Sequence, residues 1–298
     1  MKCNIKLTVG RSIFVLFGYV FITVMAIFCV LPFILIISGS LTPNDVIARE
    51  GFGLLPKGLS FSAYSLIFKY PEDVFNAYKI SIIVTGCGTL LLLFLNSMAA
   101  YVLSRKDYKY RNVFSFYMFF TTIFSGGLVP WYILMVRFLR IKEHPILAMI
   151  LPPLFSFFYI IIMRSFMSDI PAAISESAKM DGANDFLIYI RLILPLSKPV
   201  LATIGLFGAL DYWNDWFNAM LFVDKSQYFP LQYYLYRALN SIEAISRITS
   251  GTSRLIGNIP TESFKLAMTV VATGPIVILY PCLQKYFIKG LTIGAVKG

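Results

Sequence analysis

Long runs without a charged side chain dominate this chain of 298 residues. A helix rises about 1.5 Å per residue and the hydrocarbon core of a bilayer is about 30 Å thick, so roughly 20 apolar residues span it. Runs of that order cover residues 12–44, 80–104, 112–136, 144–163 and 266–284. A sixth stretch, 200–223, is interrupted by Asp211 and Asp215. This pattern predicts an all-α membrane protein with six transmembrane helices.

The overall composition agrees, with 58% hydrophobic and 14% charged residues and a mean hydropathy of +0.74. A soluble domain cannot keep that much apolar surface away from water. We expect one transmembrane domain over residues 1–298, with outer loops at 41–78 and 224–262 and a cytoplasmic loop at 169–198. The spans are expected at about 14–38, 80–104, 112–136, 144–166, 199–223 and 264–287.

Basic residues indicate the orientation, because cytoplasmic loops are enriched in Lys and Arg. One set of loops holds Lys2, Lys6, Arg11, Arg105, Lys106, Lys109, Arg111, Arg191, Lys198, Lys285, Lys289 and Lys297. Only the short loop with Arg137, Arg140 and Lys142 opposes this assignment. Both termini are therefore predicted in the cytoplasm. We interpret the net charge of +11 as a consequence of these basic cytoplasmic loops, which would also favour anionic lipid. We do not interpret it as a nucleic-acid-binding surface.

Several kinds of chemistry lack the residues they need. The sequence has no GxxxxGK[ST] phosphate loop, so we expect no ATP hydrolysis by this chain. It has one histidine, His144, and its four cysteines show no metal or redox spacing. We therefore expect no catalytic residues, no metal site and no bound cofactor, which makes this a protein without enzyme activity of its own.

The cytoplasmic loop at 169–198 has a pattern of its own. Pro171 suits the first turn of a helix that runs to about Met180, and Gly182 is well placed to end it. A second helix is expected from about 184 to 192, before Pro195. Both are too short to be stable alone in water, so they need a surface to dock on. That surface is either the protein's own helical bundle or a partner protein.

The spacing within this loop resembles a known motif, the "EAA" loop of ABC importer permeases. The matching positions are Glu176-Ser177-Ala178, Gly182, Leu192 and Leu194-Pro195, with Ser177 for Ala and Leu192 for Ile as mild departures. The resemblance implies a coupling helix that sits in a cleft of an ATP-binding subunit. The residues it marks for coupling are Glu176, Ser177, Ala178, Asp181, Gly182, Ala183, Leu194 and Pro195.

Other segments extend the resemblance over most of the chain. They are AAYVLSRKDYKYRN, FSGGLVPWYILM, IPTESFKLAMTVVATGPIVILYP and KGLTIGAVKG. They are similar to the second permease of carbohydrate importers, the MalG-like and LplC-like kind, whose LplC-like branch includes importers of alginate and pectin-derived oligosaccharides. The resemblance implies a type I ABC importer permease fold in the bacterial cytoplasmic membrane.

It also implies a set of partners. They are a second homologous permease, two ATP-binding subunits that use ATP and Mg²⁺, an extracytoplasmic sugar-binding protein, an oligosaccharide and the lipid bilayer.

The apolar stretch at 200–223, the fifth in chain order, carries polar residues that we assign to a substrate pathway: Asp211, Trp213, Asn214, Asp215, Trp216 and Asn218. Acids inside a span are costly and normally face the bundle interior or water. On one helix, Asp211 and Asp215 would share a face. The alternative is polar contact between helices, with Trp near the outer interface. Two carboxylates would repel an anionic sugar unless basic groups, such as those of a partner permease, compensate.

Three alternatives stay open. The outer loop with Arg237, Asn240, Glu243, Arg247 and Arg254 is either simply solvated or, as the resemblance suggests, meets the lid of a binding protein. The transported solute is an oligosaccharide or another small solute. A proton-coupled secondary transporter with Asp211 and Asp215 as relay would work without an ATPase. Against that stand the coupling loop and the lack of an inverted repeat.

Overall fold

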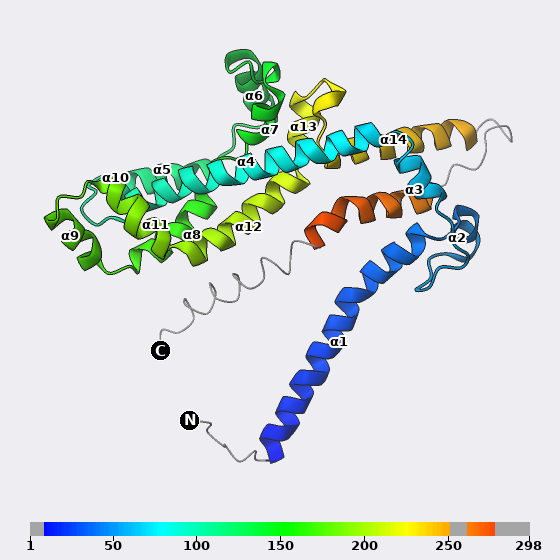
Figure 1. The fold of residues 1–298 in the computed structure, drawn as a ribbon, viewed down its shortest axis with the longest axis horizontal. Helices are drawn as coiled ribbons and strands as arrows, with labels where there is room; N and C mark the ends of the chain where they lie inside the picture. The colour runs from blue at the N-terminus through cyan, green and yellow to red at the C-terminus, as the bar shows by residue number, and fades with distance from the viewer. Residues whose placement is uncertain (1–8, 251–260, 278–298) are drawn as a thin grey trace. The chain divides into compact units, whose positions relative to one another are not determined.

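The computed structural model describes residues 9–250 and 261–277 (Figure 1). Within these residues every regular element is a helix. The chain divides into two compact units, Met1–Tyr70 with Leu239–Gly274 and Pro71–Ala238 with Pro275–Gly298. Each unit is described separately.

The first unit begins with the apolar helix α1 (Val9–Ser40), drawn in blue in Figure 1. At its end the Ser40 hydroxyl is buried, donates to the Ile37 carbonyl oxygen at 2.7 Å and lies 2.8 Å from the Tyr64 hydroxyl. These bonds hold α3 (Ser62–Ile67) against α1. The amide oxygen of Asn44, in α2 (Asn44–Glu50), accepts from the Glu262 N–H at 2.9 Å, at the start of helical residues 261–277.

Three helices form the core of the second unit: α4 (Pro71–Ser104), α8 (Phe157–Ser168) and α12 (Lys198–Asn214). Helix α4 contacts both others. It begins at Pro71 and not near residue 80 as predicted, because proline fits a first helical turn and Glu72 and Asp73 stabilise that helix end. Fully buried Leu92, Ile160 and Ile204, one from each helix, lie in this core.

The remaining predicted spans of this unit are broken. Helix α5 (Arg111–Ile123) is bent by 112° from the run of α6 (Leu128–Ile133) and η1 (Leu134–Phe138), at the glycine pair before Leu128. The span expected at 144–166 is divided into α7 (Pro145–Ile150) and α8. The span expected at 199–223 is divided into α12 and α13 (Phe217–Phe222).

Asn96 of α4 supports one of these breaks. Its side chain is fully buried and its Nδ2 donates to the Leu154 carbonyl oxygen at 2.8 Å, while its Oδ1 accepts from the Ser156 N–H at 3.0 Å. Pro152 and Pro153 interrupt the helix there. Asn96 therefore pairs backbone groups that the proline break leaves without helical partners.

Two short helices, η2 (Ile141–Glu143) and η4 (Ser226–Tyr228), and the longer α14 (Leu231–Ser250) complete the described helices, besides those at residues 169–198. By length and composition, two of the described helices can cross a bilayer, or up to five if each bent pair counts as one span. The number six therefore stays a prediction. The predicted last span, 264–287, continues beyond residue 277 and lies partly outside the described residues.

A glycine permits the closest approach of α4 to α12. A Cβ on Gly88 would lie 2.6 Å from Cζ of Tyr212, whose buried hydroxyl donates to the Ile150 carbonyl oxygen at 2.9 Å. Because this hydrogen bond fixes the far end of the ring, the ring cannot move aside without weakening the bond. A Cβ on Gly86, on the same helix, would meet nothing within 4 Å.

We therefore expect Gly88→Ala to lower the stability of the detergent-solubilised chain by about 1–3 kcal/mol, the usual cost of overpacking. Gly86→Ala should leave it unchanged or raise it slightly, because alanine favours a helix. Thermal unfolding of both variants checks this. Equal melting temperatures would show that α4 and α12 are not packed through Gly88.

Candidate functional site: the coupling loop and the α12 groove

The cytoplasmic loop predicted from the sequence forms a separate short helix, α9 (Ala172–Met180). It follows α8 after a bend of 75°. Glu176 and Ser177 are exposed on α9, whereas Ala178 is half-buried and packs against the core of the second unit. The motif residues of α9 thus comprise two exposed side chains and one alanine packed on the core.

Helix α9 ends in a Schellman motif. Gly182 has φ +82°, its N–H donates to the Lys179 carbonyl oxygen at 3.0 Å, and the Ala183 N–H donates to the Ala178 carbonyl oxygen at 3.0 Å. The first residue past such a helix favours glycine, and the apolar residues at the two ends of the six-residue bond commonly pack together. Ala178 and Ala183, both half-buried against the core, occupy those two positions. The backbone conformation at the end of α9 thus accounts for the residue types at Gly182, Ala178 and Ala183.

The chain then reverses into α10 (Asp185–Ile188), where Asn184 Oδ1 caps the Leu187 N–H at 2.8 Å. The second predicted helix does not end before Pro195. Helical structure continues through η3 (Tyr189–Ile193) and α11 (Leu194–Leu196). In the π-type turn of η3, the Leu194 N–H bonds the Tyr189 carbonyl oxygen five residues back, directly before Pro195, which has no N–H to donate.

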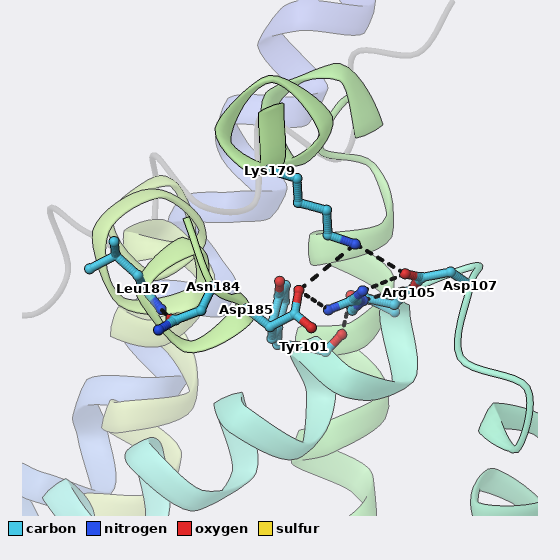
Figure 2. A network of polar contacts seen from close by, with 8 residues as sticks. Tyr101, Arg105, Asp107, Lys179, Asn184, Asp185 and Leu187 are labelled. Atoms are coloured by element: carbon cyan, nitrogen blue, oxygen red, sulfur yellow. Dashed lines mark hydrogen bonds and ion pairs between the residues drawn. The ribbon is translucent and has the colours of Figure 1, made fainter. Parts of the chain in front are cut away.

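Four charged residues join this loop to the end of α4 (Figure 2). Arg105 forms ion pairs with both Asp107 and Asp185, and its Nε donates to Asp107 Oδ1 at 2.9 Å. Lys179 of α9 reaches the same two carboxylates, at 3.3 Å from Asp107 and 3.8 Å from Asp185. We call this set the α4–α9 ion network. No sequence motif predicted this network, although the run of basic residues after α4 marked the region.

Arg105 is the innermost member of the network. Its side chain is only 20% exposed and its guanidinium lies over the Tyr101 ring, which stacks on Tyr189 at a centroid distance of 5.5 Å. The Tyr189 hydroxyl is 2.7 Å from the Ser97 hydroxyl of α4. The hydrogen bond from Arg105, and then the Lys179 ammonium, hold the pKa of Asp107 well below its usual range.

The outward face of the loop is exposed and mixed in character. Met180 is 89% exposed and Phe186 is 56% exposed, beside Glu176 and Asp181. Among the described residues neither of these two acids forms an ion pair or a side-chain hydrogen bond. These exposed residues are the candidates for contact with a partner protein.

The predicted pathway residues do not form one cluster. Helix α12 ends at Asn214 and Asp215 is extended (φ −76°, ψ 98°), so the expectation that Asp211 and Asp215 share a helix face is wrong. Asp215 leaves the helix because it caps α13, accepting from the Asn218 N–H at 3.0 Å and from Asn218 Nδ2 at 2.6 Å. Trp213 is buried, and Asn214 Nδ2 donates to the Leu210 carbonyl oxygen at 2.9 Å. Trp216 stacks on Tyr236 at 4.5 Å.

Asp211 instead faces a groove of about 710 Å³ between α5, α8 and the break before α8. We call it the α12 groove, after the helix that carries Asp211. Its carboxylate accepts a hydrogen bond from the Tyr159 hydroxyl. Half of the other lining residues are aromatic and four carry a hydroxyl group: Phe114, Tyr117, Met118, Thr121, Thr122, Pro153, Phe155, Ser156, Phe157 and Phe158. Asp211 is the one predicted pathway residue that this groove contains, and the sequence did not indicate its partner Tyr159.

The chain matches the family model for the binding-protein-dependent transport system inner membrane component over residues 97–293. It is 38% identical to the polygalacturonan/rhamnogalacturonan transport system permease protein YtcP of Bacillus subtilis, covering 94% of this chain and 96% of that protein. It is also 38% identical to the protein LplC of the same organism, covering 90% of each.

This chain belongs to the binding-protein-dependent permease family of ABC importers. A solved relative, from the crystal structure of a bacterial ABC transporter involved in the import of the acidic polysaccharide alginate, superposes with a TM-score of 0.77. It is 30% identical and the match covers 94% of this permease and 98% of that chain. The type I permease fold and the membrane location expected from the sequence are thereby confirmed.

Where the structure describes it, at residues 224–250 and 261–262, the second predicted outer loop of the permease is largely helical. It contains α14, whose Arg237 lies 5.0 Å over the Phe229 ring and whose Asn240 is exposed. Glu243 pairs with Lys265 at 3.0 Å. Arg254 and the side chain of Arg247 lie outside the described residues.

The lowered pKa of Asp107 predicts how pH acts on the coupling loop. A carboxylate with a depressed folded-state pKa stabilises the fold above its ordinary pKa of about 4 and loses this contribution as pH falls toward the folded value. Hydrogen exchange of α9 amides, normalised for intrinsic rates, should show protection that declines below about pH 4. Asp107→Asn should lower protection at neutral pH and flatten the decline, whereas Asp45→Asn should change neither. An unchanged pH profile in Asp107→Asn would contradict the assignment.

Proposed function

We propose that this permease is one of two homologous membrane subunits of an ATP-driven importer that carries oligosaccharides across the bacterial cytoplasmic membrane. It spans the membrane six times with both termini in the cytoplasm. An extracytoplasmic binding protein delivers the sugar, and two separate ATP-binding subunits hydrolyse ATP with Mg²⁺. The permease itself binds no cofactor and catalyses no reaction.

The coupling loop is the observation that carries this proposal. Glu176 and Met180 of α9 and Asp181 directly after it are exposed, so they are available for contact with a partner. Relatives with matching chains are named as transport permeases, and ABC importers hydrolyse ATP on separate subunits. We propose that the ATP-binding subunit binds the exposed surface of α9, with Ser177 at its centre. The residues that shape the loop behind this surface are Ala178, Gly182, Ala183, Leu194 and Pro195.

Coupling follows from differential binding. Closure of the ATP-binding subunits on ATP changes the geometry at α9, and the state of the permease that fits the closed subunits better becomes more populated. A loaded binding protein outside biases the same equilibrium, so the two sites act on each other reciprocally. The surface on α9 needs no chemistry of its own for this role.

The α12 groove suits a sugar. Aromatic side chains offer faces for the apolar sides of sugar rings, and Asp211 with its Tyr159 partner offers hydrogen bonds to hydroxyl groups. A carboxylate within a membrane helix normally faces protein or water, not lipid. The relatives named for polygalacturonan and alginate transport favour an acidic oligosaccharide. For such a substrate the charge of Asp211 requires compensating basic groups, which we assign to the second permease.

The first test concerns the α9 surface. Gly182→Pro fixes φ near −65° and removes the N–H that bonds Lys179, whereas Gly182→Asn tolerates the left-handed conformation. We expect the proline variant to lose sugar uptake while ATP hydrolysis continues uncoupled, and the asparagine variant to keep uptake within about twofold, since asparagine costs a fraction of a kcal/mol there. Proteoliposomes with the complete importer provide both rates. Normal uptake by the proline variant would contradict the coupling role.

Glu176→Lys tests the surface itself, because it reverses the charge of an exposed side chain of α9, beside the cavity between α9 and the end of α4. We expect this variant also to uncouple hydrolysis from uptake, with weaker co-purification of the ATP-binding subunit. Glu143→Lys, the same change at an exposed site in η2, is the matched control and should keep both. Uptake driven by a proton gradient without any ATP-binding subunit would instead support a secondary transporter.

The pathway proposal is tested at Asp211. Asp211→Asn and Tyr159→Phe remove, respectively, the charge and the hydroxyl of the pair in the groove. If the groove carries the sugar, oligosaccharide uptake should fall by about tenfold, equivalent to a hydrogen bond to a charged group, without a matching fall in melting temperature. If the pair only joins α8 to α12, melting temperature should fall with uptake. A panel of acidic and neutral oligosaccharides and unrelated solutes identifies the substrate class.

A further inference from the structure

Helix α9 is attached to the rest of the second unit at few points. Its C-terminal turn continues into α10, and Ala178 touches the core. Between α9 and the ends of α4 and α8 lies a cavity of about 240 Å³. A nine-residue helix has little stability alone, so what crosses this gap determines how α9 is held.

Side chains of the α4–α9 ion network cross the gap. Lys179 extends from α9 toward Asp107 and Asp185, and Arg105 joins the same two carboxylates from the end of α4 (Figure 2). Each carboxylate therefore has one cation from each helix. The network connects α9 to α4 although the two helices are separated by more than sixty residues in the chain.

Helix α4 is the element best placed to receive a movement. Arg105 follows its last residue, Ser104, and packs on Tyr101 one turn earlier. From there α4 runs through the core between α8 and α12. Protein interiors are close-packed and of low compressibility, so a displacement of the Arg105 end is passed along the helix and to its neighbours.

We propose that the α4–α9 ion network is a joint that transmits movement of α9 to α4, with Lys179 and Arg105 as positioning residues for coupling. The inference rests on the proposed function, because it assumes that an ATP-binding subunit moves α9. It adds a second route into the membrane besides the direct chain connections from α9 to α8 and α12. If those connections suffice, the network has no effect on coupling.

The energetics suit a joint that tightens or loosens without unfolding the chain. Exposed ion pairs contribute little singly, but Arg105 is largely removed from water and has two carboxylate partners. Lys179 and both aspartates stay partly exposed, so water replaces their contacts when they separate. Loss of Lys179 should therefore weaken the joint without unfolding the bundle.

The experiment uses the complete importer with the full-length chain in proteoliposomes and measures sugar molecules imported per ATP hydrolysed. Lys179→Met keeps the aliphatic stem and removes the charge. We expect it to lower this ratio by about fivefold or more, the lower range of allosteric coupling. Arg105→Met should have a similar effect. Lys106→Met removes the neighbouring exposed charge, which has no ion pair among the described residues, and should leave the ratio unchanged.

The double variant distinguishes a joint from direct contact with the ATP-binding subunit. If Lys179 and Arg105 act through one network, combining both changes should lower the ratio hardly more than either alone. If Lys179 instead contacts the ATP-binding subunit, Lys179→Met should reduce co-purification of that subunit, and the largely buried Arg105 should have an independent effect.

Two results would overturn the inference. One is an unchanged ratio in Lys179→Met with the complex intact. The other is multiplication of the two single effects in the double variant. Failure of the proposed function looks different, since the unaltered chain would then neither retain an ATP-binding subunit nor import sugar with ATP. Melting temperatures and subunit ratios measured on the same preparations separate loss of assembly from loss of coupling.

Discussion

The need to pair every backbone polar group inside a membrane governs this structure. Hydrocarbon offers no hydrogen bonds, so a break in a spanning helix survives only where side chains or other helices serve the exposed groups. Asn96 does so at the break before α8, and Asp215 does so at the start of α13. Backbone pairing thus accounts for polar residues of the apolar stretches such as Asn96 and Asp215. Asp211 pairs with the Tyr159 side chain instead and is available to a substrate.

At the coupling loop the demand is different, because water is available but the helices are too short to persist alone. The Schellman turn at Gly182 and the cap by Asn184 supply local order, and the charged side chains of Arg105 and Lys179 supply the attachment to the bundle. Tight local geometry combined with ion pairs that water can replace suits the proposed role of α9 as an element that moves as a unit between two proteins.

Much of this was predictable from local patterns, and the rest depended on contacts distant in sequence. Glycine and proline positions predicted α9 and its end, and the motif spacing predicted the family. The continuation of helix past Pro195 was missed because a π-type turn has no simple sequence signal. The role of Asp215 was missed because helical spacing from Asp211 assumed an unbroken helix. The contacts of Arg105 and Asp107 with the α9–α10 segment, and of Tyr159 with Asp211, were missed because these partners lie many residues apart.

The two candidate sites lie on the same packed body, and this links them. Tyr212 follows Asp211 on α12, contacts Gly88 of α4 and donates to the Ile150 carbonyl oxygen, while the bond from Tyr159 to Asp211 joins α8 to α12. In the proposed coupling, a shift of α4 that begins at Arg105 would reach Asp211 through the Tyr212 ring, which packs directly on Gly88. Close packing allows two discrete arrangements more readily than a gradual deformation. The arrangement of the groove and the position of the coupling loop are accordingly expected to change together, as alternating access requires.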